Sequence, residues 1–133
     1  MNRYLLDTSA LLTLRDDEAG AQQVADLLYQ AQHGSVECMA CFMTQMELLY
    51  RVWCDEGKQV AHLALEQARS LPISWIHEEQ ALLEKAAELK AMHPISLADA
   101  WIAACALLQD AALVHKDPEF EAVDCSQIKL PYK

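Results

Sequence analysis

Glycine is scarce in this sequence, with three residues among 133, at positions 20, 34 and 57. Three isolated glycines cannot form the Gly-rich turn of a P-loop or of a dinucleotide-binding fingerprint. The Gly-x-Ser-x-Gly turn that presents the serine of α/β hydrolases is missing as well. These absences exclude common nucleotide-binding sites and a common class of covalent hydrolase.

Long apolar runs are also absent, although apolar residues make up 53% of the chain. No run approaches the ~20 residues that a membrane span requires. The N-terminus passes from Met1 into a short apolar strand without the features of a signal peptide. We therefore expect one cytoplasmic domain over residues 1–133, with a core of its own and no membrane association.

The five cysteines do not form a disulfide framework, because their number is odd and most stand in apolar stretches. Cys38 and Cys41 have C-x-x-C spacing, but they lie in a strand-like run and no second Cys or His pair stands at zinc-finger distance. We expect reduced thiols in the core.

Basic residues are few: 10 Lys and Arg face 20 Asp and Glu, a net charge of −10. Such a chain binds nucleic acid poorly by charge alone, since affinity for phosphates comes from Lys and Arg. Bound divalent cations would make the local charge at a binding site positive. The negative charge also suits a basic protein partner.

Apolar spacing predicts alternating strands and helices, and therefore an α/β fold: a three-layer domain with a central, mainly parallel sheet flanked by helices. Ligand sites in such sheets gather outside the carboxyl ends of the strands. The predicted strands are 3–6, 36–42, 72–76, 112–115 and a short edge strand within 125–130. The predicted helices are 9–15, 18–32, 44–55, 58–70, 78–91 and 96–108.

Four acids stand at the boundaries of these elements: Asp7, Glu47, Asp99 and Asp117. The predicted fold can bring all four to one edge of the sheet. Clustered carboxylates raise one another's pKa unless a cation balances them. Hard oxygen ligands of this kind suit Mg²⁺ or Mn²⁺, so a metal-dependent phosphodiesterase is the first hypothesis.

Each of the four acids also fits a purely structural role as a helix-capping residue. Carboxylates at helix N-termini are kept ionised by the backbone dipole, so capping and metal binding are compatible. The possible caps are the boxes Thr44-x-x-Glu47 and Ser96-x-x-Asp99, Asp117 before Pro118, and Asp7 before Thr8.

Four segments read together resemble the PIN domain, and specifically the VapC-type ribonuclease toxins of bacterial toxin–antitoxin pairs. The segments are residues 4–12, 44–48, 95–104 and 113–120, each containing one of the four acids. The resemblance spans nearly the whole chain. One position departs from the family, which usually has Thr or Ser where this chain has His115.

The resemblance implies that Asp7, Glu47, Asp99 and Asp117 hold one or two Mg²⁺ or Mn²⁺ ions and that Ser9 braces them. It implies in-line attack of water on an RNA phosphate, without a covalent nucleophile. It also implies a homodimer and a cognate antitoxin that inserts a basic residue among the carboxylates. We interpret His115 as a supporting residue behind the ligands, while a core role or a contact to substrate phosphate stays open.

Two other functions remain open from the sequence. A PIN-like fold without catalysis would act as a binding or regulatory module through its antitoxin. A small-molecule phosphatase on the same sheet is disfavoured, because Ser9 stands where phosphatases with an aspartate nucleophile need a second Asp. Metal-dependent cleavage of RNA separates the endoribonuclease from the binding module, and hydrolysis of a generic phosphate monoester would favour the phosphatase.

Overall fold

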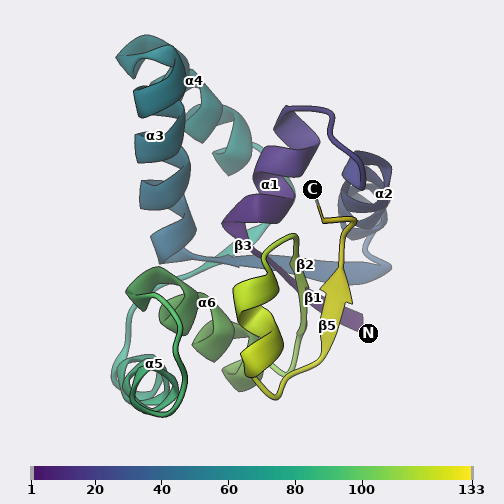
Figure 1. Cartoon of the computed structure of the whole chain (residues 1–133). Helices are drawn as coiled ribbons and strands as arrows, with labels where there is room; N and C mark the ends of the chain where they lie inside the picture. Colours follow the sequence, from purple (N-terminus) through teal and green to yellow (C-terminus); the bar gives the residue numbers. More distant parts are fainter. Residues whose placement is uncertain (1, 133) are drawn as a thin grey trace.

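The centre of the protein is a five-stranded parallel sheet with strand order β3-β2-β1-β4-β5. The computed structural model describes residues 2–132 (Figure 1). The strands are β1 (Asn2–Leu6), β2 (Val36–Cys41), β3 (Ser74–Ile76), β4 (Ala112–His115) and β5 (Gln127–Lys129). The predicted parallel α/β sheet is confirmed, including its short edge strand.

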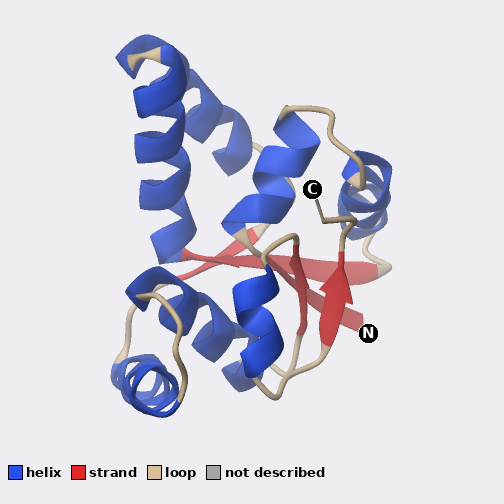
Figure 2. Cartoon of the chain, in the orientation of Figure 1, coloured by secondary structure: helices blue, strands red, loops and turns tan. Residues whose placement is uncertain are grey.

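Helices cover both faces of this sheet and complete three layers (Figure 2). The pair α1 and α2 packs on one face through Leu11, Val24 and Leu28, and α5 and α6 pack on the other through Leu82 and Ile102. The helices are α1 (Thr8–Arg15), α2 (Ala21–Gln32), α3 (Phe42–Glu56), α4 (Lys58–Arg69), α5 (Gln80–Met92) and α6 (Leu97–Leu108), followed by the 3-10 helix η1 (Pro118–Ala122). No helix within residues 2–132 is both long and apolar enough to cross a membrane.

The strands are apolar at successive positions because both faces of the sheet are buried. Leu5 and Leu6 are both fully buried, and they belong to the cores on opposite faces. Cys38 and Cys41 are likewise free, buried and divided between the two cores. The C-x-x-C pair is therefore core, as its apolar context predicts, and its two thiols point away from each other.

A third apolar cluster joins α3 to α4, which lie side by side on the same side of the sheet as α1 (Figure 1). Leu48 and Val52 of α3 pack against Ala61, Ala64 and Ala68 of α4. Small residues along α4 allow the two helices to approach closely. This packing fixes the position of the first turns of α3, which contain Glu47.

The strand order reverses at β1, which pairs with β2 on one side and β4 on the other. The connections after β1 and β4 therefore diverge and leave a crevice at the carboxyl edge. The backbone N–H of Asp7 donates to the carbonyl of Val114 at 3.0 Å, which ties the end of β1 to β4.

The expected capping box at Thr44 is wrong. Helix α3 begins two residues earlier, at Phe42, and its N-cap is Cys41, which makes no side-chain capping bond. The helix follows β2 directly, so the strand's last residue takes the cap position. Thr44 is instead fully buried in the first turn, with its hydroxyl turned towards α1.

The C-terminal segment of the described chain packs closely against Gly20, at the start of α2. The φ of 101° at Gly20 lies in the left-handed region, which favours glycine. A Cβ atom here would lie 3.1 Å from Cδ of Pro131 and 3.2 Å from Cβ of Leu130. The helix consequently begins at Ala21, three residues later than the sequence pattern predicts.

Candidate active site

The four acids found in the sequence lie at the carboxyl edge of the sheet. Asp7 follows β1 and caps α1, and Asp117 follows β4 and caps η1. Glu47 lies in the second turn of α3, the helix that follows β2 without a loop. Asp99 lies in the first turn of α6, whose N-terminus meets this edge because a crossover helix runs antiparallel to the strands.

The carboxylates are close enough to influence one another's ionisation. Oxygen atoms of Asp99, Asp117 and Glu119 all lie within 4.8 Å of one another. Asp7 is coupled electrostatically to Glu47 and Asp117, and Asp99 to Asp7, Asp117 and Glu119. In this acidic cluster Asp99, Asp117 and Glu119 form the close group, Asp7 interacts with two of them, and Glu47 interacts with Asp7.

Burial raises the pKa of Asp7 to about 6, and the charges of Glu47 and Asp117 add to this effect. Hydrogen bonds from Ser9 oppose it, since they stabilise the charged form. The pKa of Asp99 is also raised, mainly by burial and then by the charges of Asp7 and Asp117. Both shifts favour the protonated carboxyl, and a bound divalent cation would oppose them.

Ser9 connects Asp7 to the loop that contains Asp117. Its backbone N–H donates to Oδ2 of Asp7 at 3.0 Å, and its hydroxyl donates to the same oxygen. The hydroxyl oxygen in turn accepts the backbone N–H of Lys116 at 2.9 Å. One side chain thus orients the Asp7 carboxylate and holds the loop after β4 against α1.

Glu47 is oriented by two threonines that the sequence analysis did not assign to the site. The hydroxyl of Thr8 donates to Oε1 of Glu47 at 2.8 Å and lies 3.0 Å from the hydroxyl of Thr44. Both threonines are buried. Their contact depends on the meeting of α1 and α3, so local sequence contains no signal for it.

We expect Thr8→Val to lower the affinity of the site for Mg²⁺ or Mn²⁺ by about 10–100-fold, the usual effect of removing a group that orients a ligand. Isothermal titration with each metal would measure the change. Thr13→Val is the matched control, because Thr13 is buried in the same helix and its hydroxyl has no hydrogen-bond partner. Equal affinity in the two variants would contradict a role for Thr8 in orienting Glu47.

Only half of the predicted capping box at Ser96 and Asp99 is present. The hydroxyl of Ser96 accepts the backbone N–H of Asp99 at 3.1 Å, as an N-cap should. The Ser96 N–H, however, donates to the carboxylate of Glu119 and not to that of Asp99. Asp99 is therefore available to the acidic cluster, and Glu119 ties the start of α6 to η1.

Glu119 is the acid that the sequence analysis missed. It lies two residues after Asp117, and its N–H donates to Oδ1 of Asp117 at 3.0 Å. The only local signal is an acid two positions beyond another acid, a pattern that also occurs in ordinary capped turns. Its proximity to Asp99 arises from tertiary structure.

His115 supports the backbone of Asp117 from the core. Its ring is fully buried, and its Nδ1 accepts the backbone N–H of Asp117 at 3.0 Å. Nε2 therefore carries the proton and donates to Oε1 of Gln127 at 2.9 Å. Burial lowers the pKa of His115, which keeps the ring neutral. A contact between this ring and substrate phosphate is excluded by its burial.

The donor set fits a hard divalent cation. Within residues 2–132, none of Asp7, Glu47, Asp99 and Asp117 forms an ion pair with a basic side chain. Their ligand atoms are all carboxylate oxygens, which suit Mg²⁺ and Mn²⁺ better than Zn²⁺. Buried acids without a counter-charge are costly, and a bound cation would remove that cost.

Comparison with solved structures shows the same fold in toxins of bacteria. VapBC2 from Rickettsia felis, bound to a DNA fragment from its promoter, has a TM-score of 0.77 at 18% identity, covering 97% of this chain and 99% of that one. VapC20 of Mycobacterium tuberculosis, a toxin that cleaves the sarcin–ricin loop, has a TM-score of 0.72 at 18% identity, with 96% and 99% covered.

A third structure agrees with these two. DNA-bound VapBC from Salmonella typhimurium has a TM-score of 0.77 at 17% identity, covering 97% of this chain and 98% of that one. No curated protein sequence matches the chain. The sequence pattern of the PIN domain family, however, matches residues 4–125. The chain therefore belongs to the PIN domain family.

Proposed function

We propose that this protein is a Mg²⁺- or Mn²⁺-dependent endoribonuclease and the toxin of a toxin–antitoxin pair, acting in the cytoplasm as one domain over residues 1–133. The observation that supports this function best is the acidic cluster, whose members lack a basic partner among the described residues. Membership of the PIN family and the likeness to VapBC toxins support it further.

In this proposal Asp7, Glu47, Asp99 and Asp117 are the metal ligands, and Asp99 and Asp117 share their cation with Glu119. A bound cation would supply the Lewis acidity that activates water and stabilises the charge on an RNA phosphate. Ser9 and Thr8 fix the orientation of two ligands, Asp7 and Glu47. His115 fixes the position of the Asp117 backbone.

Incubation of the purified protein with total RNA, with and without Mg²⁺ or Mn²⁺, tests the function, and sequencing of new RNA ends maps the cuts. We expect new ends only with metal. Equal cleavage in EDTA would point to a contaminating nuclease. Absence of cleavage with both metals would instead favour a binding module that acts through its antitoxin.

The antitoxin is proposed to present Arg or Lys to the carboxylates of Asp7 and Glu47. The net charge of −10 favours a basic partner, and such contacts would be charge-assisted. One solved structure similar to this chain is a toxin–antitoxin complex from Klebsiella pneumoniae. Because the basic side chain and the metal would occupy the same cluster, metal should weaken the complex.

A homodimer is proposed across the exposed apolar surface of α3, α6 and α5. Met46 and Tyr50 of α3 line a hollow with Leu97 of α6, and Leu97 also lines a second hollow with Leu83 of α5. Leu97 is 68% exposed and Met46 55%. Large exposed apolar side chains that form a continuous surface are typical of protein interfaces.

We expect Leu97→Lys to convert a dimer into a monomer without loss of monomer stability, because Leu97 is exposed at the junction of the two hollows. Sedimentation velocity over a range of protein concentrations would show the change in mass. Leu63→Lys is the control, since Leu63 is also exposed but lies on α4, outside this surface. A wild-type protein that sediments as a monomer would remove the dimer proposal.

A further inference from the structure

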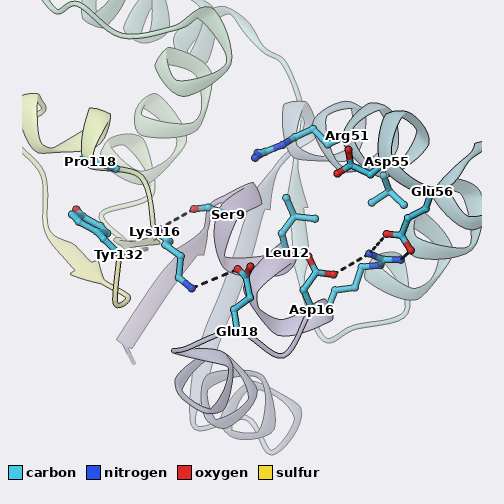
Figure 3. A pocket seen from close by; sticks show the side chains of 12 residues that line it. Ser9, Leu12, Asp16, Glu18, Arg51, Asp55, Glu56, Lys116, Pro118 and Tyr132 are labelled. Atoms are coloured by element: carbon cyan, nitrogen blue, oxygen red, sulfur yellow. Dashed lines mark hydrogen bonds and ion pairs between the residues drawn. The ribbon is translucent and has the colours of Figure 1, made fainter.

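A cavity of about 410 Å³ lies beside the acidic cluster, between α1, α3 and the segments that contain Lys116 and Tyr132 (Figure 3). Ser9 and Lys116 form part of its wall. Ser9 binds the Asp7 carboxylate, and Lys116 directly precedes Asp117. The cavity therefore opens next to the proposed metal ligands, and its volume is in the range of small-molecule sites.

Arg51 extends into this cavity from α3, one helical turn beyond Glu47 (Figure 3). Every other Lys or Arg within residues 2–132 has a partner for its charged group. Arg51 is exposed and alone among them in having no hydrogen bond, ion pair or ring contact. The basic residues that do form a hydrogen bond, ion pair or ring contact are Arg3, Arg15, Lys58, Arg69, Lys85, Lys90, Lys116 and Lys129.

The other charged side chains of the cavity are largely paired. Arg15 binds Glu56 at 2.7 Å and Asp16 at 3.0 Å. Lys116 lies 3.5 Å from Glu18, and its side chain is 6% exposed. The two cations of these pairs contact three of the four acids that line the cavity. Arg51 is thus the basic group of the cavity that is left to bind an anion.

Tyr132 lies on the opposite side of the cavity from Arg51 (Figure 3). Its hydroxyl donates to Glu121 at 2.8 Å, and Glu121 also pairs with Lys129 at 3.4 Å. The close fit of Leu130 and Pro131 against Gly20 fixes the chain just before it. The ring is therefore held in place while 39% of the residue stays exposed.

A free guanidinium and a fixed aromatic ring across a cavity match one nucleotide of single-stranded RNA. Single strands are bound through basic groups on the phosphate and aromatic rings that stack on the bases. We propose that this cavity is the subsite for the nucleotide next to the scissile phosphate, with Arg51 binding its phosphate and Tyr132 stacking on its base. This inference rests on the proposed ribonuclease function.

The test measures RNA binding without cleavage, in an Asp99→Asn background with Mg²⁺. The probe is a fluorescein-labelled, randomised single-stranded RNA of roughly 12 nucleotides, since stacking tolerates any base. Fluorescence anisotropy gives its affinity for Arg51→Gln, Tyr132→Ala and Tyr132→Phe. The controls are Arg69→Gln and Tyr29→Ala, at exposed residues that do not line the cavity. Thermal unfolding checks that every variant is folded.

Tyr132→Ala should weaken binding about tenfold, the usual loss for one stacked base, while Tyr132→Phe keeps the ring and most of the affinity. Arg51→Gln should weaken binding about fivefold and reduce the slope of log affinity against log salt by about 0.7, the value for one phosphate on a single strand. Neither control should change affinity.

The inference is overturned if Arg51→Gln and Tyr132→Ala bind single-stranded RNA as tightly as the parent. It is also overturned if Tyr132→Ala weakens binding to duplex RNA equally, because paired bases cannot stack on the ring. A wild-type protein that cleaves RNA while these variants bind normally would remove the subsite and keep the ribonuclease. A wild-type protein that cleaves no RNA would instead remove the proposed function.

Discussion

Replacing Asp99 with asparagine should reduce RNA cleavage by more than about 100-fold, since loss of a group that merely orients a metal ligand already costs 10–100-fold. The variant keeps the shape of the side chain and removes one ligand charge. It should also keep its fold, because the side chain that caps α6 is that of Ser96. Without metal its melting temperature should hold or rise, as a buried charge and its repulsion from Asp7 are removed.

Asp26→Asn is the matched control, because Asp26 is an exposed acid on α2. Cleavage rates and melting temperatures in EDTA should be measured for both variants. Retained cleavage in Asp99→Asn would remove Asp99 from the catalytic site. A marked fall in melting temperature would instead show that Asp99 serves mainly to stabilise the start of α6.

The metal-free protein should lose stability as pH rises from about 4 to about 9. The pKa of Asp7 is about 6 in the folded protein against 3.8 as its ordinary value. The folded state binds more protons between these values, so this contribution is full below the lower pKa and is lost as pH rises through the upper one. For Asp7 the loss is about 3 kcal/mol, and Asp99 adds to it in the same direction.

Urea unfolding in EDTA at several pH values would measure this dependence. His115 acts in the opposite direction, because its lowered pKa costs stability as pH falls below its ordinary value of 6.5. The difference between wild type and Asp7→Asn isolates the part due to Asp7, and a difference that does not vary with pH would contradict the assignment. Saturating Mg²⁺ should abolish the loss, since the cation replaces the protons.

The elements of the fold could be predicted because each carries a local signal. Fully buried parallel strands are continuously apolar, and the helices show apolar spacing on one face. The first residue of α3 could not be predicted from such a local signal. Thr44 followed by Glu47 has the pattern of a capping box, but the direct connection from β2 makes Cys41 the N-cap. Tertiary structure therefore overrides the stronger local signal.

The candidate site was predictable only in part, for the same reason. Asp7 and Asp117 lie where strands end, so their shared edge follows from the parallel fold. The contacts of Thr8 with Glu47 and of Glu119 with Ser96 join segments far apart in the chain. The buried orientation of the His115 ring depends on its hydrogen bond to Gln127 in the edge strand β5. None of these contacts has a signature within one segment.

The hydrogen bond from Lys116 to Ser9 joins residues 107 positions apart, and this separation affects when the site forms during synthesis. Domains fold as they leave the ribosome, N-terminal parts first. Until β4 emerges, β1 has a free edge and Asp7 lacks both its bond to Val114 and its neighbour Asp117. A growing chain therefore carries no complete acidic cluster. For the ribonuclease proposed above, cleavage therefore has to wait until β4 and the loop that contains Asp117 have been made.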